Sequence, residues 1–568
     1  MAYRRTAARA ELAWADVPAR QDKMLGSLPV IASFCRRLGI AEIIDEHAPI
    51  RELATVTAGQ AVEAMICNRL TSPAPLVHVQ DWARGWAVEE VLGIGPLALN
   101  DDKLGRTLDA IAPHLEEITS AAAVRAITAF GIDIAQLHWD MTSFSLHGAY
   151  DDADEDYPEP RYGHPRDRRP DLLQIQAGIA AAGDGGIPVC HRAYDGAAAE
   201  VSQVTGAMTA LKKIAGTRTF LLIGDSKLIS CDNVAAITGK GCTFLAPASK
   251  TYVKAAELAA CDLAQATQVS YVAQRDEHKS PEQRGRWHVL EDARPFRIRN
   301  PKRKKDPPIE VRRIFVHSSA RASAAATSRA KKLARARDDL DRLTRGLGGR
   351  FYPDEKAVTG RVRQIATSRK VGPYLRCTVG TAPAAGAAEV TSTAGPAGGA
   401  EAAGRPGKPA LTWWFDQDAI DAEAATDGWY ALLTSLDPSI TATGVLLRYK
   451  GQEAVERRYG NLKGPLAVAP MFLNSNRRIA ALITVISLAL LIFCLIEREA
   501  RRSLAPETRI EGLYNRQPAR PTGRLILTTL ASLQLIPATA TSPAQIIRPN
   551  PVQARLLELL GVDPIRPP

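Results

Sequence analysis

The spacing of apolar residues divides the chain into a helical first part and a mixed second part. Up to about residue 135, apolar residues recur every three or four positions, as on one face of a helix. This spacing predicts helices over four segments, which are 27–48, 57–71, 75–86 and 101–130. Residues 1–135 are therefore expected to form a mainly helical N-terminal domain.

From residue 136 the pattern changes to short apolar runs that alternate with amphipathic segments. The runs LHWDMTSFSLHG, LLQIQAGIAA and IPVCHRAYDG predict three strands, and AGDGG between the last two predicts a hairpin turn. A helix (VSQVTGAMTALKKIAG), a strand (FLLIGDS), a helix (CDNVAAITGKG) and a strand (CTFLAPASK) are predicted next. This is the order of elements in a ribonuclease-H-like sheet, so residues 136–250 are expected to be the first part of such an α/β domain.

A long stretch without this alternation follows. Residues 251–435 are too many for a structureless loop inside a compact domain, so they are expected to form an inserted domain. Within it, the Ala-, Gly- and Pro-rich residues 380–410 predict a flexible linker, and TWWFDQD and DGWYALLTS predict strands that return to the core. The α/β domain is expected to resume over residues 436–503. The Pro- and Arg-rich tail, 504–568, contains one predicted helix (VQARLLELLGV) and is expected to be peripheral.

The charge of the chain favours a polyanionic partner. The formal net charge is +11, and the pI is about 9.2. Over residues 284–350, 20 Lys and Arg stand against 7 Asp and Glu, a local net charge of +13. This basic block contains Lys302, Arg303, Lys304 and Lys305 in the run PKRKKDPP. Such a block is typical of a surface that contacts phosphates, although an ordinary charged surface helix has a similar composition.

One segment has the length and composition of a short membrane span. Residues Ile479 to Ile496 are 18 in number, carry no charge and have charged residues on both sides. The same composition is expected of a helix that is buried on several sides within an α/β domain. Because the segment stands alone, the second interpretation is preferred, and no membrane partner is expected.

The cysteines and the N-terminus indicate the compartment. No CxxC pair and no Cys/His cluster with zinc spacing occurs among the eight cysteines, which are Cys35, Cys67, Cys190, Cys231, Cys242, Cys261, Cys377 and Cys494. They are expected to be reduced and mostly buried. The first residues are basic but lack the apolar core of a signal peptide. The protein is therefore expected to be cytoplasmic.

The segment RYKGQEAVERRYGNLK, residues 448–463, carries the first candidate chemistry. If it is helical, one stripe is apolar and a second is polar. The polar stripe holds Tyr449, Gln452, Glu456 and Lys463, whose spacing places all four on one face. An acid between a phenol and a lysine suits a metal ligand with phosphate-binding neighbours. A solvated face with paired charges is the alternative.

Two further acids lie in sequence that predicts strands. Asp140 lies within LHWDMTSFSLHG, and Asp225 ends the apolar run TFLLIG. A buried strand seldom carries a carboxylate unless that group is paired or binds a metal. Together with Glu456, these residues supply the carboxylates that a two-metal phosphoryl-transfer site needs to hold Mg²⁺ ions roughly 4 Å apart.

With these three acids and the spacing around Glu456, the chain resembles a known family, the DDE transposases of bacterial insertion sequences. The superfamily it resembles has the signature Tyr-x2-Arg-x3-Glu-x6-Lys. The positions that carry the resemblance are Asp140, Asp225, Tyr449, Gln452, Glu456 and Lys463, with glutamine in place of the signature arginine. The helical N-terminus and the long insertion are similar to the subgroup with an extra N-terminal helical domain. The resemblance covers roughly residues 25–500.

The resemblance implies a fold and an activity. The fold is a ribonuclease-H-like catalytic domain that is split by a long, partly β insertion and preceded by the helical domain, which serves either DNA-end binding or packing and self-association. The implied activity is metal-dependent cleavage and strand transfer at the ends of an insertion sequence. Asp140, Asp225 and Glu456 would hold two Mg²⁺ (or Mn²⁺) ions. Tyr449 and Lys463 would hold phosphates near the scissile bond.

The implied partners are double-stranded DNA, both element ends and target, and a second copy of the chain in a homodimeric active complex. No small-molecule substrate is expected, and the protein would associate with the nucleoid. Gln452 lacks the bidentate grip of an arginine on phosphate. A catalytically inactive, transposase-derived DNA-binding protein is therefore the alternative, and a membrane-anchored protein is a third hypothesis.

Overall fold

The structure is a computed structural model. It describes residues 22–49, 55–148, 150, 154–163, 169–273, 276–277, 279–300, 305–381, 407–451, 458, 460, 473, 475–505, 508–539 and 542–564. The chain divides into two compact units. The first unit comprises Met1–Leu222 and Gly451–Pro568, and the second unit comprises Ile223–Lys450.

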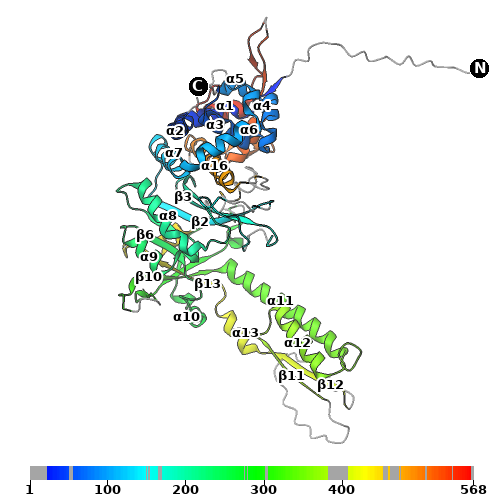
Figure 1. Cartoon of the computed structure of the whole chain (residues 1–568). Helices are drawn as coiled ribbons and strands as arrows, with labels where there is room; N and C mark the ends of the chain where they lie inside the picture. The colour runs from blue at the N-terminus through cyan, green and yellow to red at the C-terminus, as the bar shows by residue number, and fades with distance from the viewer. Residues whose placement is uncertain are drawn as a thin grey trace, which may run out of the picture. The chain divides into compact units, whose positions relative to one another are not determined.

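The N-terminal part of the first unit is helical, as predicted (Figure 1). Its α-helices are α1 (Leu28–Leu38), α2 (Ile40–His47), α3 (Ala58–Thr71), α4 (Val79–Gly85), α5 (Val88–Leu92), α6 (Asp101–Ile111) and α7 (Leu115–Phe130). The single helix predicted over 27–48 is two helices, because Gly39 adopts a φ of 62° between them. The helix predicted over 101–130 is likewise divided by a 3₁₀ turn that contains Pro113.

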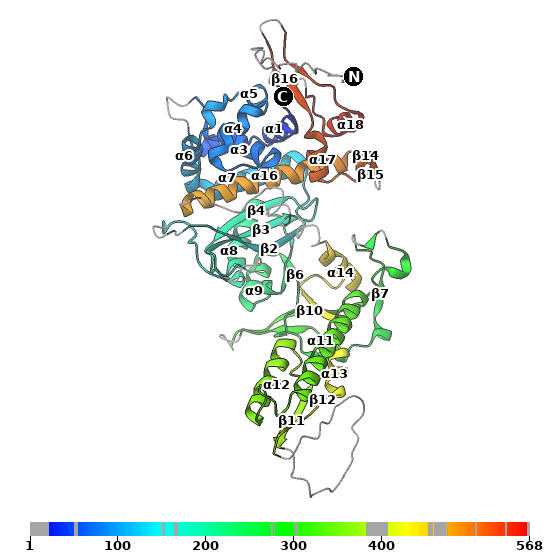
Figure 2. The same ribbon diagram turned by 90° about the vertical axis from the view of Figure 1, so that its right-hand side faces the viewer.

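The apolar segment forms α16 (Asn476–Arg502), the central helix of the first unit. Every residue from Ile479 to Ile496 is buried. Figure 2 shows α16 between the N-terminal helices and β4 (Pro188–Tyr194), and it packs against α1, α3, α6, α7 and β4. The helix is long and apolar enough to cross a membrane. Its packing accounts for the all-round apolar surface and confirms the prediction of a helix buried on several sides.

The sheet of the first unit begins with three antiparallel strands, β2 (Gln136–Ser145), β3 (Gln174–Ala182) and β4. The β3–β4 turn contains Gly185 and Gly186, both at positive φ (75° and 63°), which confirms the predicted hairpin. Next come α8 (Glu200–Ala215) and β5 (Leu221–Ile223), and the strand order is β4-β3-β2-β5. The boundary between the two units falls within β5.

The second unit continues with α9 (Cys231–Thr238) and β6 (Thr243–Pro247), so the predicted order of strands and helices is confirmed. Its strands run in the order β5-β6-β13-β10-β8-β7, and β9 pairs with β10. The remaining bounds are α10 (Ala255–Ala259), β7 (Thr267–Val269), β8 (Trp287–Glu291), β9 (Phe296–Ile298), β10 (Ile309–Ser318), β13 (Trp429–Thr434) and α14 (Ala442–Lys450). The pairs from β6 to β7 are antiparallel.

The second unit contains a hydrophobic core apart from its sheet, which we call the second core. It joins α11 (Ser319–Arg345), α12 (Glu355–Arg369), β11 (Leu375–Thr381) and β12 (Pro409–Phe415), and α13 (Gln417–Ala424) packs against it. The prediction that TWWFDQD returns to the main sheet is wrong, because this segment is in β12 and pairs with β11 alone. Trp413 is buried in this core, Trp429 is buried in β13, and Trp414 is exposed.

The tail contributes structure to the first unit. It contains β14 (Ile510–Tyr514), β15 (Gln517–Ala519), α17 (Gly523–Leu530), β16 (Gln534–Ile536), β17 (Gln545–Ile546) and α18 (Pro551–Leu560). Both α17 and α18 pack against α16, and β16 pairs with β1 (Lys23–Met24) near the start of the chain. The expectation of a peripheral tail is therefore wrong, since its apolar faces complete the cover of α16.

All eight cysteines are free thiols, and five of them are buried, as predicted. Burial raises the pKa of the Cys190 and Cys494 thiols to about 12. Thiols in this state are protonated at neutral pH and serve as small apolar side chains.

Candidate catalytic site and nucleic-acid interface

Asp140 lies in the middle of β2 and is buried, with 8% of its surface exposed. One carboxylate oxygen, Oδ1, accepts a hydrogen bond from the backbone N–H of Met141 at 2.8 Å. The strand is buried along nearly its whole length and is an interior strand, with β3 at one edge and β5 at the other. The sequence therefore predicted correctly that Asp140 is a carboxylate inside a buried strand.

Two buried histidines share the sheet face of Asp140. Side chains alternate along a strand, so His138 lies on the same face of β2. The register joins Asp140 to Ile179 of β3 and Ile179 to His191 of β4. Burial lowers the pKa of His138 and of His191 to about 4, so both imidazoles are neutral at pH 7. These histidines therefore add no positive charge to the face that carries Asp140.

Asp225 lies where the sequence predicted, directly after the strand β5 and Gly224. It precedes a short 3₁₀ turn, Ser226–Leu228, and its Oδ1 accepts a hydrogen bond from the Lys227 N–H at 2.8 Å. The side chain is partly exposed. Asp225 belongs to the second unit and Asp140 to the first.

The signature segment, residues 448–463, is described only in part. Tyr449 lies in the last turn of α14, and the neighbouring Lys450 places its ammonium 3.6 Å from the ring centre of Trp287. Gln452, Glu456 and Lys463 lie outside the described residues, so the convergence of the three acids stays a prediction. Within the described ranges, no group of three His, Cys, Asp or Glu side chains could hold a metal ion.

Arg458, two residues beyond Glu456, is a residue that the sequence reasoning missed. It is buried, with 6% of its surface exposed. Its guanidinium lies 3.3 Å from both carboxylate oxygens of Glu497 on α16, and it donates a hydrogen bond of 2.5 Å to the carbonyl of Gly185. Glu497 also accepts from the Gly523 N–H (2.8 Å) and pairs with Arg501 (2.9 Å). This residue therefore ties the signature segment to α16 and to the β3–β4 hairpin.

The charges of this cluster are mutually stabilised. Burial alone raises the pKa of Glu497, but Arg458, Arg501 and the Gly523 N–H together hold it below its ordinary value. The sequence contained a signal for this contact. If the segment is taken as helical, Arg458 falls on the apolar stripe that contains Val455 and Leu462. An arginine at such a position needs a buried partner, because an unpaired buried charge is costly.

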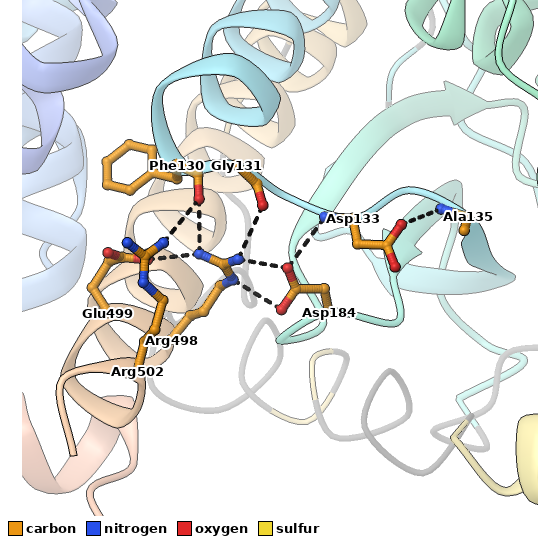
Figure 3. Close-up of polar contacts among 8 residues, drawn as sticks. All are labelled: Phe130, Gly131, Asp133, Ala135, Asp184, Arg498, Glu499 and Arg502. Atoms are coloured by element: carbon orange, nitrogen blue, oxygen red, sulfur yellow. Dashed lines mark hydrogen bonds and ion pairs between the residues drawn. The ribbon is translucent and has the colours of Figure 1, made fainter. Parts of the chain in front are cut away.

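A second arginine, Arg498 of α16, binds the same hairpin (Figure 3). Arg498 holds the carboxylate of Asp184 with two hydrogen bonds, 2.9 and 2.6 Å long. It also donates to the carbonyls of Phe130 and Gly131 at the C-terminal end of α7, at 3.1 and 3.3 Å. Asp184 accepts a further bond from the Asp133 N–H. The turn, the end of α7 and α16 thus form one connected polar cluster.

The basic block contains both paired and exposed cations. Of the predicted DNA contacts at 302–305, only Lys305 is described, and it is exposed; Lys302, Arg303 and Lys304 lie outside the described residues. Several arginines of the block form ion pairs, namely Arg297 with Glu310, Arg312 with Glu291, Arg313 with Glu257 and Asp292, and Arg329 with Asp427. Of these acidic partners, only Glu257 and Asp427 lie outside residues 284–350, so they alone reduce the local charge below the +13 counted from the sequence.

Comparisons with known proteins give two similarities. Residues 20–121 match the family model "Domain of unknown function (DUF4277)". No curated protein matches the chain. Among solved structures, the chain is similar to a cryo-EM structure of the piggyBac transposase synaptic complex with hairpin DNA, at 10% identity and a TM-score of 0.38. That similarity covers 89% of this chain and 80% of the other.

Proposed function

We propose that the protein is a DNA transposase that cleaves and joins DNA strands at the ends of an insertion sequence. The observation that supports this most is Asp140, a carboxylate buried in the middle of the first strand of an α/β sheet. It stands in a chain that also has Asp225 directly after a later strand and the signature spacing from Tyr449 to Lys463. A buried carboxylate is stabilised by ion pairs, hydrogen bonds or a metal ion, and metal binding is the role proposed here for Asp140.

The donor set fits two divalent ions of the hard type. Asp140, Asp225 and Glu456 offer carboxylate oxygens, which are the ligands that Mg²⁺ and Mn²⁺ prefer. When bound, such ions lower the pKa of an attacking water or 3′-hydroxyl and stabilise the leaving oxygen. In this proposal Tyr449 and Lys463 hold the phosphates beside the scissile bond, and Arg458 holds the segment that carries Glu456.

The proposal includes the domain organisation. The catalytic domain would be ribonuclease-H-like, formed by residues 136–250 and 436–503 and split by the inserted residues 251–435. Double-stranded DNA would be the substrate and the target, and two copies of the chain would act together. The specific observation that favours the alternative, an inactive DNA-binding descendant, is Gln452 at the arginine position.

A cleavage assay on a supercoiled plasmid that carries the native element tests the proposal. The full-length protein should nick or linearise the plasmid with Mg²⁺ and should bind without cutting when Ca²⁺ replaces it. Asp140→Asn should reduce cleavage at least about a hundredfold, or about 2.7 kcal/mol of barrier. Asp171→Asn, which changes an exposed aspartate, is the matched control and should cut normally. Binding without cutting in any metal would support the inactive descendant.

A further inference from the structure

The helix α11 has one buried edge and one exposed face. Arg329, Ala336, Leu340 and Leu343 are buried, and the last three belong to the second core. The opposite face follows steps of four along the helix. It holds Ser323, Thr327, Lys331 and Arg335, with Ala324, Ser328 and Lys332 beside them, and together these seven residues line an open hollow of the surface.

The five cations of α11 from Arg321 to Arg335 fall into two classes. Arg329 is held by an ion pair with Asp427 and is 8% exposed, and Arg321 lies 5.1 Å over the ring of Tyr430. In contrast, Lys331, Lys332 and Arg335 form no hydrogen bond or ion pair with any residue that the structure describes. The first class stabilises the fold, whereas the second is available to a partner.

The side chains of this face are suited to contact the phosphate backbone of a nucleic acid. From Ser319 to Arg337 the sequence contains six Lys and Arg and no Asp or Glu. Ser323, Thr327 and Ser328 add hydroxyl donors, and their small size lets a backbone approach the helix closely. Residues 323 to 335 span about 18 Å at 1.5 Å per residue. Duplex DNA presents one phosphate charge per about 1.7 Å of its axis, so this face would meet several phosphates at once.

Other macromolecules fit less well. A helix that lies on a lipid surface needs large apolar side chains beside its basic ones, and a protein hot spot needs aromatic anchors. The seven residues that line the hollow include neither. We propose that the Ser323–Arg335 face of α11 binds the sugar–phosphate backbone of duplex DNA. This inference rests on the proposed function only in taking DNA as the substrate, and it adds a contact surface outside the acids and the 302–305 run.

The test is the salt dependence of DNA binding by the full-length protein. Lys331, Lys332 and Arg335 are changed to Gln together, and affinity for a duplex of arbitrary sequence is measured by fluorescence anisotropy from 50 to 200 mM salt. The slope of log affinity against log salt should become shallower by about 2.7, because each phosphate contact contributes about 0.9. The matched control changes three exposed cations of the second unit that lie outside the basic block, Lys356, Arg363 and Lys408, to Gln and should keep the slope.

Each outcome decides the question. A wild-type slope in the triple variant, an equal loss in the control, or no duplex binding by the wild type would overturn the inference. Thr327→Glu is a second variant, which adds a like charge in place of removing cations, and it should also weaken binding. If the wild type binds DNA through α11 but never cleaves it with Mg²⁺, the surface stands and the proposed enzymatic function fails.

Discussion

At the scale of single residues, the cost of burying a charge connects sequence to site. Asp140, Arg458 and Glu497 are all buried. Arg458 and Glu497 satisfy each other. Asp140 accepts a bond from the Met141 N–H, and the histidines on its face are neutral at pH 7. A structural ion pair accounts for the burial of Arg458 and Glu497, and metal binding is the function that we propose for Asp140.

Glu456 is predicted to be the third acid, in preference to its neighbour Glu453. Only Glu456 stands seven residues after Tyr449 and seven before Lys463. Glu456→Gln should abolish strand cleavage and keep DNA binding, because it removes one ligand charge and conserves shape. Glu453→Gln should leave cleavage within about tenfold, roughly 1.4 kcal/mol of barrier. The opposite result in the plasmid assay would show that the signature alignment is wrong.

The buried histidines predict an acid-sensitive fold. Above about pH 6.5, the ordinary pKa of histidine, His191 is neutral in both the folded and the unfolded chain. In that range His191 does not reduce the free energy of unfolding. Between about pH 6.5 and 4 only the unfolded chain binds the proton, so stability falls by about 1.4 kcal/mol per pH unit, up to about 3 kcal/mol. The drop in Tm from pH 7 to pH 5 should therefore be smaller in His191→Gln than in the wild type. An equal drop in both would mean that His191 is protonated in the folded protein.

At the scale of elements, periodicity predicted most helices and strands, and the failures have identifiable causes. The apolar run of β2, the hairpin turn and the all-round apolarity of α16 are local signals, and they were interpreted correctly. The break at Gly39 depends on a single left-handed residue, which a hydrophobic pattern does not register. The pairing of β12 with β11 rather than with the sheet depends on the second core, which no local pattern encodes.

The C-terminal end of α16 is predicted to be coupled to the signature segment. Arg458→Met leaves Glu497 buried with Arg501 and the Gly523 N–H, and it should cost about 3 kcal/mol. Glu497→Gln should also destabilise the protein, because Arg458 then loses its counter-charge. The double variant should cost less than the sum of the two by about 1–3 kcal/mol, as expected for groups in contact. Additive losses in unfolding measurements would argue against a direct interaction.

At the scale of the whole molecule, the sequence located carboxylates but could not place them in space. Asp140 and Asp225 are 85 residues apart, and Glu456 follows Asp225 by 231 residues. Signals in one sequence report neighbours along the chain, so neither the ion pair of Arg458 with Glu497 nor the meeting of the three acids could be derived from spacing alone. The ion pair comes from the structure, and the convergence is a prediction that an experiment has to decide.

Localised backbone cleavage by Fe²⁺ provides that experiment. Fe²⁺ can occupy sites built for Mg²⁺ because it also binds carboxylate oxygens, and with ascorbate and peroxide it produces hydroxyl radicals that cut only nearby backbone. If Asp140, Asp225 and Glu456 share ions roughly 4 Å apart, the full-length chain should be cut near all three positions at once. Asp140→Asn should suppress all three cuts, and excess Mg²⁺ should compete with them. Cuts near one acid that survive the loss of the others would mean that the carboxylates lie apart, and the two-metal site would then be refuted even if DNA binding through α11 remained.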